Sequence, residues 1–179
     1  DSHDNVAMED ALGGAPQITV LRPGAIYGRF AHPRVLREWY LVGKVARGER
    51  RLALPDGGTQ LFQRVAVERV GLAIAAAIEH APEGLWACNI GDPQDLTFGG
   101  LARLVEELLG WKWEIEHVPW EEGDHPWNVR HPVLADTTRL RDVLGVTGAE
   151  PLAATSDQIG WLWRQRAELA ALELELFSA

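Results

Sequence analysis

Apolar residues recur along the chain with two periods, and these periods predict alternating strands and helices. The β-branched segment 17–21 and the apolar segment 85–90 are typical of buried strands. Between them, residues 67–80 are apolar on nearly every face, which predicts a helix that is buried on most sides. This alternation of strands and helices favours an α/β fold.

The same patterns predict the remaining elements. Further helices are expected at 6–12, 35–47, 97–109 and 153–174, with a short one between Asp136 as its cap and Gly145 as its stop. Further strands are expected at 51–54, 60–65 and 113–118, and loops at 22–28 and 119–132. The chain begins with a helix that leads into a strand, and it contains few strands. We therefore expect its first strand to belong to the middle of a doubly wound sheet.

Composition narrows the class of protein. The 179 residues are 46% apolar and 24% charged, which is ordinary for a globular domain. The net charge of −9 disfavours a nucleic acid as partner, because such proteins need a basic surface. No segment is apolar enough to span a membrane, and the polar start is not a secretory signal. The single cysteine, Cys88, excludes an internal disulfide, so we expect a cytoplasmic protein.

Phosphate-binding loops are absent from the sequence. No two glycines stand two positions apart, so the dinucleotide fingerprint G-x-G-x-x-G cannot be placed anywhere. There is no Walker A loop either. The chain therefore contains no recognisable cradle for a pyrophosphate.

A polar and aromatic loop carries the other candidate chemistry. His125 and His131, with Asp124 beside the first, match no metal-site spacing, so we expect no metal and interpret them as histidines of a solvated loop. Trp120 and Trp127 in this loop could stack on a sugar or a base, or could simply pack. Both interpretations of the tryptophans stay open.

Several segments together resemble the C-terminal half of an extended short-chain dehydrogenase/reductase of the NAD-dependent epimerase/dehydratase group. The most specific is 18–28, Ile-Thr-Val-Leu-Arg-Pro-Gly-Ala-Ile-Tyr-Gly, which is similar to that family's strand and Arg-Pro-x-x-x-Tyr-Gly loop. Segments 55–70 and 88–91 resemble its "Val-x-Val-x-Asp-Val-Ala" and "Tyr-Asn-Ile-Gly" motifs. Segment 136–145 resembles its "Asp-x-Ser-Lys…Leu-Gly" helix.

The resemblance implies an architecture. Residues 1–30 would form the end of a Rossmann-like lobe, made of a helix, a strand and the Arg-Pro-Gly loop. Residues 31–179 would form the smaller α/β substrate-binding lobe, with elements that return to the first lobe. The N-terminal dinucleotide-binding half of the family is absent from this sequence, so we expect a truncated or atypical member.

The resemblance also implies site residues. NAD or NADP would be the cofactor, with Pro23 and Gly24 near its nicotinamide, and Tyr27 would line the substrate cleft. Arg64 and Arg130 stand close to segments where family members hold a nucleotide-sugar diphosphate, and arginine would bind it by bidentate contact. Candidate partners are this small-molecule substrate, the missing half and a second copy of the chain.

Four positions depart from the family pattern. The catalytic tyrosine and lysine would fall at Asp1 and Asn5, which cannot do that chemistry, so the catalytic residues are unknown. Arg69 stands where the family usually has aspartate, and Ala66 where it usually has histidine or tyrosine. Tyr40 and Lys44 have the family's Tyr-x-x-x-Lys spacing but follow the strand that this pair should precede, so we interpret the match as a coincidence.

Two functions follow. The first is the substrate-binding portion of an NAD(P)-dependent epimerase, dehydratase or reductase that acts on a carbinol or carbonyl carbon, with a sugar or nucleotide sugar as one candidate substrate; by itself this portion should be inactive. The alternative is a non-catalytic module on the same fold that senses a cofactor or binds a partner.

Overall fold

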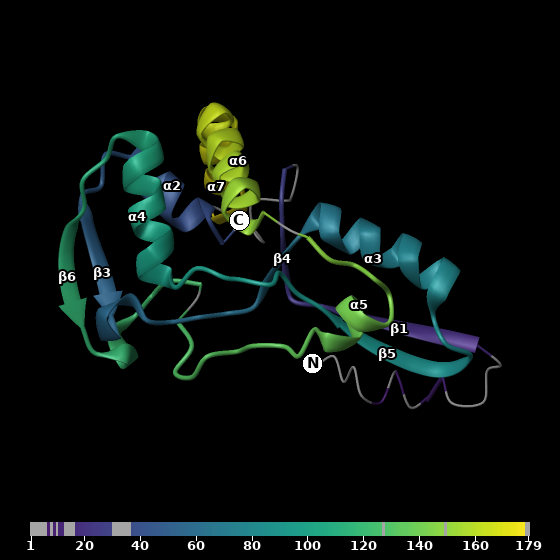
Figure 1. Ribbon diagram of the computed structural model, residues 1–179. Helices are drawn as coiled ribbons and strands as arrows, with labels where there is room; N and C mark the ends of the chain where they lie inside the picture. Colours follow the sequence, from purple (N-terminus) through teal and green to yellow (C-terminus); the bar gives the residue numbers. More distant parts are fainter. Residues whose placement is uncertain are drawn as a thin grey trace.

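The computed structural model of the protein describes residues 7, 9, 11–12, 17–29, 37–126, 128–148 and 150–177. Figure 1 shows an elongated molecule with a pair of strands at each end and helices between and above them. The expected helix 6–12 lies mostly outside the described residues, of which 7, 9 and 11 are helical. No helix of the described part is long and apolar enough to cross a membrane.

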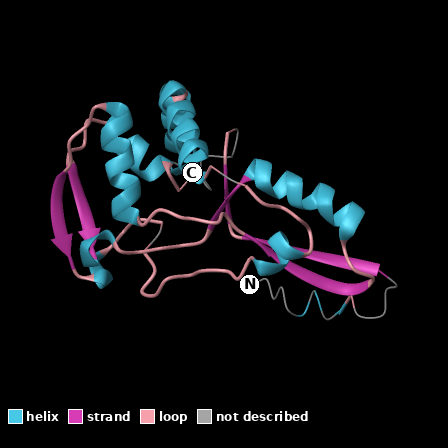
Figure 2. Ribbon diagram, viewed as in Figure 1, coloured by secondary structure: helices cyan, strands magenta, loops and turns pink. Residues whose placement is uncertain are grey.

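Parallel strand pairs form the sheets of the described residues (Figure 2). Strand β1 (Gln17–Pro23) pairs with β5 (Gly84–Ile90), and β2 (Ala25–Tyr27) pairs with β4 (Arg64–Ala66). At the far end of the molecule β3 (Arg51–Pro55) pairs with β6 (Glu114–Val118). Every pair is parallel and joined by a long crossover, so the expected α/β class is confirmed.

Helix α3 (Val67–His80) is the crossover between β4 and β5. It packs against β1 and β5 through Ala73, which is fully buried. Its opposite side is open to solvent, with Ile74 and Ile78 exposed. The prediction that the helix is buried on most sides was therefore wrong, because an apolar helix of alanine and glycine needs only one narrow face to pack on a two-stranded sheet.

Four helices pack around β3. These helices are α2 (Trp39–Ala46), α4 (Phe98–Leu109), α6 (Pro151–Arg164) and α7 (Arg166–Phe177). Their common core is aliphatic and aromatic, and includes Leu41, Leu52, Leu101, Val105, Ile159 and Leu162. A separate core lies against β1 and β5 and includes Val65, Cys88, Ile90, Leu140 and Leu144, with the last two from the short helix α5 (Thr138–Asp142) and its end. The proposed division at residue 30 stays a prediction.

Local signals set the ends of α4. The Thr97 hydroxyl accepts a hydrogen bond from the Gly100 amide at 3.1 Å, which caps the first turn. Gly110 ends the helix in the left-handed conformation with φ of 62°. Asp136 accepts the Thr138 amide at 2.9 Å before α5, but the N-cap of this helix is Thr137, and the helix ends at Asp142, before the expected stop at Gly145.

We expect Thr97→Ala to lower the free energy of unfolding by about 1 kcal/mol, because it leaves a helix N–H without its acceptor. Urea titration followed by circular dichroism measures this loss. Thr97→Ser keeps the hydroxyl and should stay close to the parent. An equal loss in both variants would contradict the capping role.

Three expected elements differ from those observed. Residues 25–27 of the expected loop form β2, because they pair with β4 after a bend at Gly24. The expected strand 60–65 does not form over its whole length. Phe62 makes an isolated β-bridge with Val133, and the strand β4 begins only at Arg64. The expected helix 153–174 is broken at Gln165 (φ −90°, ψ 5°), where the Arg166 guanidinium binds the Trp163 carbonyl at 2.7 Å. The start of the expected helix 35–47 lies outside the described residues.

Candidate functional site

The carboxyl ends of β1 and β5 lie side by side at the centre of the molecule. Open parallel sheets usually bind their ligands at the carboxyl ends of the strands. The Gly24 amide donates to the Ile90 carbonyl at 2.8 Å, and the chain then turns into β2. A Cβ on Gly24 would lie 2.7 Å from the Gln63 carbonyl oxygen, so only glycine fits this turn. Pro23 and Gly24 thus stand at the strand end predicted for them.

Tyr27 at the end of β2 is 3% exposed, and its hydroxyl donates to Asp92 Oδ2 at 2.7 Å. Asp92 Oδ1 accepts the Ala66 amide at 3.3 Å. Burial, followed by the hydrogen bond to Asp92, raises the pKa of Tyr27 well above its ordinary value. Burial also raises the pKa of Asp92, against the opposing effect of the Tyr27 hydroxyl. Tyr27 therefore stays protonated at neutral pH.

Arg64 lies behind the Tyr27 ring, with its Cζ atom 4.7 Å from the ring centroid. The side chain is 2% exposed and donates to Glu38 Oε1 at 2.9 Å and to Asp95 Oδ1 at 2.7 Å. Burial alone would lower the pKa of Arg64, but the two carboxylates outweigh burial and raise it. Arg64 is thus a fixed cation inside an ion-pair network.

This network continues into α6. The Gln158 amide donates to Glu38 Oε2 at 3.2 Å, and Arg64 reaches the Thr155 hydroxyl at 3.4 Å. Both α6 residues are buried. The network therefore ties α6 and the segment before α2 to strand β4.

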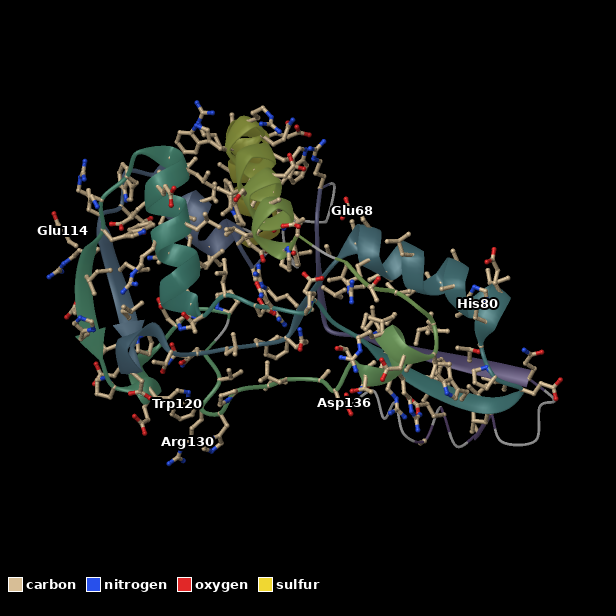
Figure 3. The ribbon with its side chains drawn as sticks, viewed as in Figure 1. Glu68, His80, Glu114, Trp120, Arg130 and Asp136 are labelled. Carbon is tan, nitrogen blue, oxygen red and sulfur yellow. The ribbon has the colours of Figure 1, made fainter. Side chains whose placement is uncertain are left out.

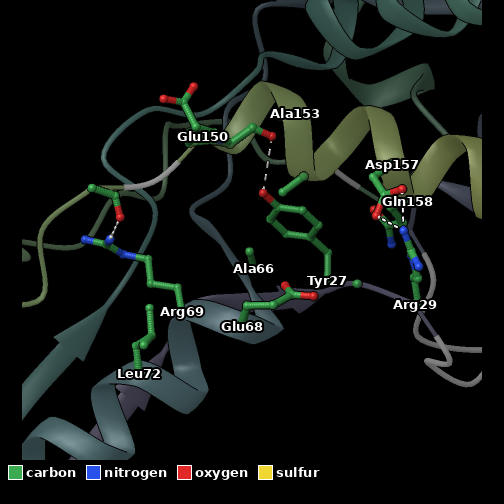
Figure 4. Close-up of a pocket in the computed structure, with 14 residues that line it drawn as sticks. Tyr27, Arg29, Ala66, Glu68, Arg69, Leu72, Glu150, Ala153, Asp157 and Gln158 are labelled. Carbon is green, nitrogen blue, oxygen red and sulfur yellow. Dashed lines mark hydrogen bonds and ion pairs between the residues drawn. The ribbon is translucent and has the colours of Figure 1, made fainter.

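A cavity of about 400 Å³ opens between the end of β2, the start of α3 and the start of α6 (Figure 4). Its wall is mainly apolar or small, with charged residues at the edges. The lining residues are Tyr27, Gly28, Arg29, Ala66, Glu68, Arg69, Leu72, Gly148, Glu150, Pro151, Ala153, Ala154, Asp157 and Gln158. At one edge Arg29 and Asp157 form an exposed ion pair.

The predicted site residues fall into two places. Pro23, Gly24, Tyr27 and Arg64 come together at the strand ends, since β2 pairs with β4 immediately after β1 ends. Arg130 lies in the long loop and is exposed. Its Cζ atom is 5.8 Å from the centroid of the Trp120 ring. Figure 3 shows both residues at the edge of the molecule. Their binding roles stay predictions.

The histidine loop holds no metal cluster within the described residues. His125 is 4% exposed and stacks on Phe98, with ring centroids 3.6 Å apart. Burial lowers the pKa of His125 to about 4, although Asp124 opposes this. The prediction of a solvated histidine was wrong for this residue, because a polar loop gives no sequence signal that one ring folds inward. Trp127 lies outside the described residues.

Tyr40 and Lys44 share one face of α2, with the Lys44 Nζ atom 5.0 Å from the ring centroid. The Tyr40 hydroxyl donates to Asp124 at 2.7 Å, and burial together with this carboxylate raises its pKa. A proton-transferring tyrosine needs the opposite shift. The structural interpretation of this Tyr-x-x-x-Lys match is thus supported.

Sequence reasoning missed the acidic partners at the site, Glu38, Asp92 and Asp95. A signal existed for Asp92, because it follows a predicted strand end, where ligand-binding residues gather. Glu38 had none, since it stands 26 residues from Arg64 in an ordinary helix start.

Neither a protein-family model nor a curated protein matches the chain. Solved structures do match it. They include MoeE5 in complex with UDP-glucuronic acid and NAD (TM-score 0.66, 23% identity, 83% of this chain and 48% of that one). A second is UDP-glucose 4-epimerase of Thermotoga maritima with UDP-glucose (TM-score 0.66, 22% identity, 83% of this chain and 47% of that one). A third is the dTDP-glucose 4,6-dehydratase DesIV of Streptomyces venezuelae with NAD (TM-score 0.67, 18% identity, 85% of this chain and 45% of that one).

These likenesses concern the fold. The chain has the Rossmann-like fold of NAD-dependent epimerases and dehydratases and spans about half the length of the solved chains. That coverage agrees with the predicted resemblance to a C-terminal half.

Proposed function

We propose that this chain is the substrate-binding portion of an NAD(P)-dependent epimerase, dehydratase or reductase, acting on a carbinol or carbonyl carbon of a nucleotide sugar. The observation that carries the proposal is the strand-end junction, where Pro23 and Gly24 lie beside the Tyr27–Arg64 pair. The fold supports it, because solved proteins that share it hold NAD and nucleotide sugars.

The residues present fit one end of the cofactor. The turn at Gly24 brings bare backbone and the Pro23 ring to the sheet edge, a surface suited to the flat nicotinamide. When bound, NAD(P) would accept or return a hydride at the substrate carbon. No glycine-rich turn for the pyrophosphate exists in this sequence, so the chain by itself should neither bind NAD(P) tightly nor turn over substrate.

The chain's own residues would bind and orient the substrate. Arg64 packs behind the Tyr27 ring and holds it in place, while Glu38 and Asp95 offset its positive charge. Its donors already serve Glu38 and Asp95, so a direct phosphate contact by Arg64 would require those bonds to be exchanged. Arg130 is exposed and forms no ion pair among the described residues, which suits a direct contact to a diphosphate.

Arg130→Ala is expected to weaken binding of UDP-glucose or dTDP-glucose roughly 10- to 100-fold, the value of one charge-assisted contact of about 1.5–3 kcal/mol. Isothermal titration calorimetry measures the affinity. Because Arg130 is exposed, the melting temperature should not change. Arg103→Ala, which removes an exposed arginine from α4, is the matched control. Equal affinity of both variants would remove Arg130 from the site.

The alternative is a cofactor-sensing module, favoured by Asp1 and Asn5 at the positions of the family's catalytic pair. Titration with NADH separates the two functions. A chain that binds NADH and neither nucleotide sugar would support the module. A chain that binds a nucleotide sugar and not NADH would support the substrate-binding portion.

A further inference from the structure

We propose that the cavity between α3 and α6 binds a small organic carboxylate with an apolar body, held through its charge by Arg69. This site goes beyond the proposed function: it shares Tyr27 with the strand-end site, but Pro23, Gly24, Arg64 and Arg130 do not line the cavity. It depends on Arg69, the position at which the sequence departs from the family pattern.

Arg69 is a buried cation, 6% exposed. Among the described residues no carboxylate forms a salt bridge with it, although Asp92 interacts with it electrostatically. Its side chain donates instead to three neutral carbonyls, those of Gly91 at 2.9 Å, Gly148 at 3.0 Å and Val146 at 3.3 Å. Buried charges are normally paired, because desolvation penalises a lone one.

The guanidinium keeps donors for a ligand. It carries five N–H groups, so three bonds leave two of them unused. The three carbonyls fix its plane in advance, which reduces the entropy lost when a planar carboxylate binds. The geometry therefore suits a carboxylate at the Arg69 end of the cavity.

The acids around the cavity do not neutralise this charge. Asp92 interacts electrostatically with Arg69 but is bound by the Tyr27 hydroxyl and the Ala66 amide. In Figure 4 the Glu68 side chain leaves α3 in the opposite direction from Arg69, and the Glu150 carboxylate points away from the Tyr27 ring. Asp157 pairs with Arg29 at the far edge.

The rest of the cavity defines the body of the ligand. Tyr27, Leu72 and Ala153 present apolar surface, and Ala66 leaves room at the base. The volume of about 400 Å³ suits a molecule with one ring or a short aliphatic chain. Helix α3 also begins beside the cavity without a side-chain cap, so its first backbone N–H groups favour negative charge there.

Titration of the 15N-labelled chain with phenylacetate, followed by NMR, tests the proposal. We expect saturable shifts of the Arg69 side-chain Nε–H signal and of the Leu72 amide. Phenylacetamide, which has the same shape without the charge, should bind roughly tenfold more weakly or worse. Equal binding of the two probes would overturn the role of the charge, and no shift with phenylacetate at millimolar concentration would overturn the site.

Two variants locate the site. Arg69→Gln should weaken phenylacetate binding roughly tenfold or more, whereas Arg103→Gln, on α4, should bind like the parent. Because Arg69→Gln also loses carbonyl contacts, Ala153→Phe provides a second test that fills the cavity and leaves Arg69 in place. Unchanged affinity in Ala153→Phe would overturn the proposal even if Arg69→Gln fails to fold.

Discussion

Replacing Arg64 with alanine is expected to lower the free energy of unfolding by about 3–5 kcal/mol, because it strands two buried carboxylates. Glu38 and Asp95 each lie within 3 Å of the guanidinium, and their side chains are 3% exposed. Chemical denaturation at neutral pH, monitored by tryptophan fluorescence, measures the loss.

Two comparisons isolate the charge effect of Arg64. Arg22→Ala removes an exposed ion pair with Glu9 and should cost much less stability, because water screens exposed charges. Combining Arg64→Met with Glu38→Gln and Asp95→Asn removes all three charges, and this variant should recover much of the stability lost. If Arg64→Ala loses no more stability than Arg22→Ala, the network does not hold α6 against β4.

His125 is expected to make the fold sensitive to mild acid. Its pKa is about 4 in the folded chain and 6.5 for the free side chain, so the unfolded state binds the proton first. The contribution of neutral His125 to the free energy of unfolding is fully present above pH 6.5. It decreases as the pH falls below 6.5, and it is lost below pH 4. The difference of about 2.5 pKa units corresponds to about 3 kcal/mol.

Unfolding free energies of the parent and His125→Phe between pH 7 and 4 measure this contribution. Phenylalanine keeps the stack on Phe98 and cannot be protonated, so the variant should lose less stability in acid than the parent. The raised pKa of Asp92 acts in the opposite direction, but it acts in both proteins and cancels in the comparison. His131→Phe, which changes an exposed histidine of the same loop, should retain the parental pH dependence. Equal acid sensitivity of the parent and His125→Phe would show that His125 is not the sensitive group.

Most of the strands and helices, and the Pro-Gly turn after β1, could be predicted from the amino-acid sequence. β-branched and apolar runs marked β1 and β5, and glycine and threonine marked the ends of α4. Pro23 and Gly24 were expected directly after a strand and lie at the end of β1, whereas Tyr27 lies in β2, where the sequence predicted a loop. Steric restriction of the backbone, capping and local burial act over a few residues, so their causes lie within each segment.

The partners of the charged residues could not be predicted from the sequence and became visible in the folded structure. Arg64 meets carboxylates 26 and 31 residues away and a hydroxyl 91 residues away, and no local rule selects them. The same holds for the inward stacking of His125 and for the lone charge of Arg69. Whether a polar group is paired, buried or left facing a cavity depends on which distant segments fold against it. The reason is that ion pairing and desolvation depend on distance in space and not on separation along the chain.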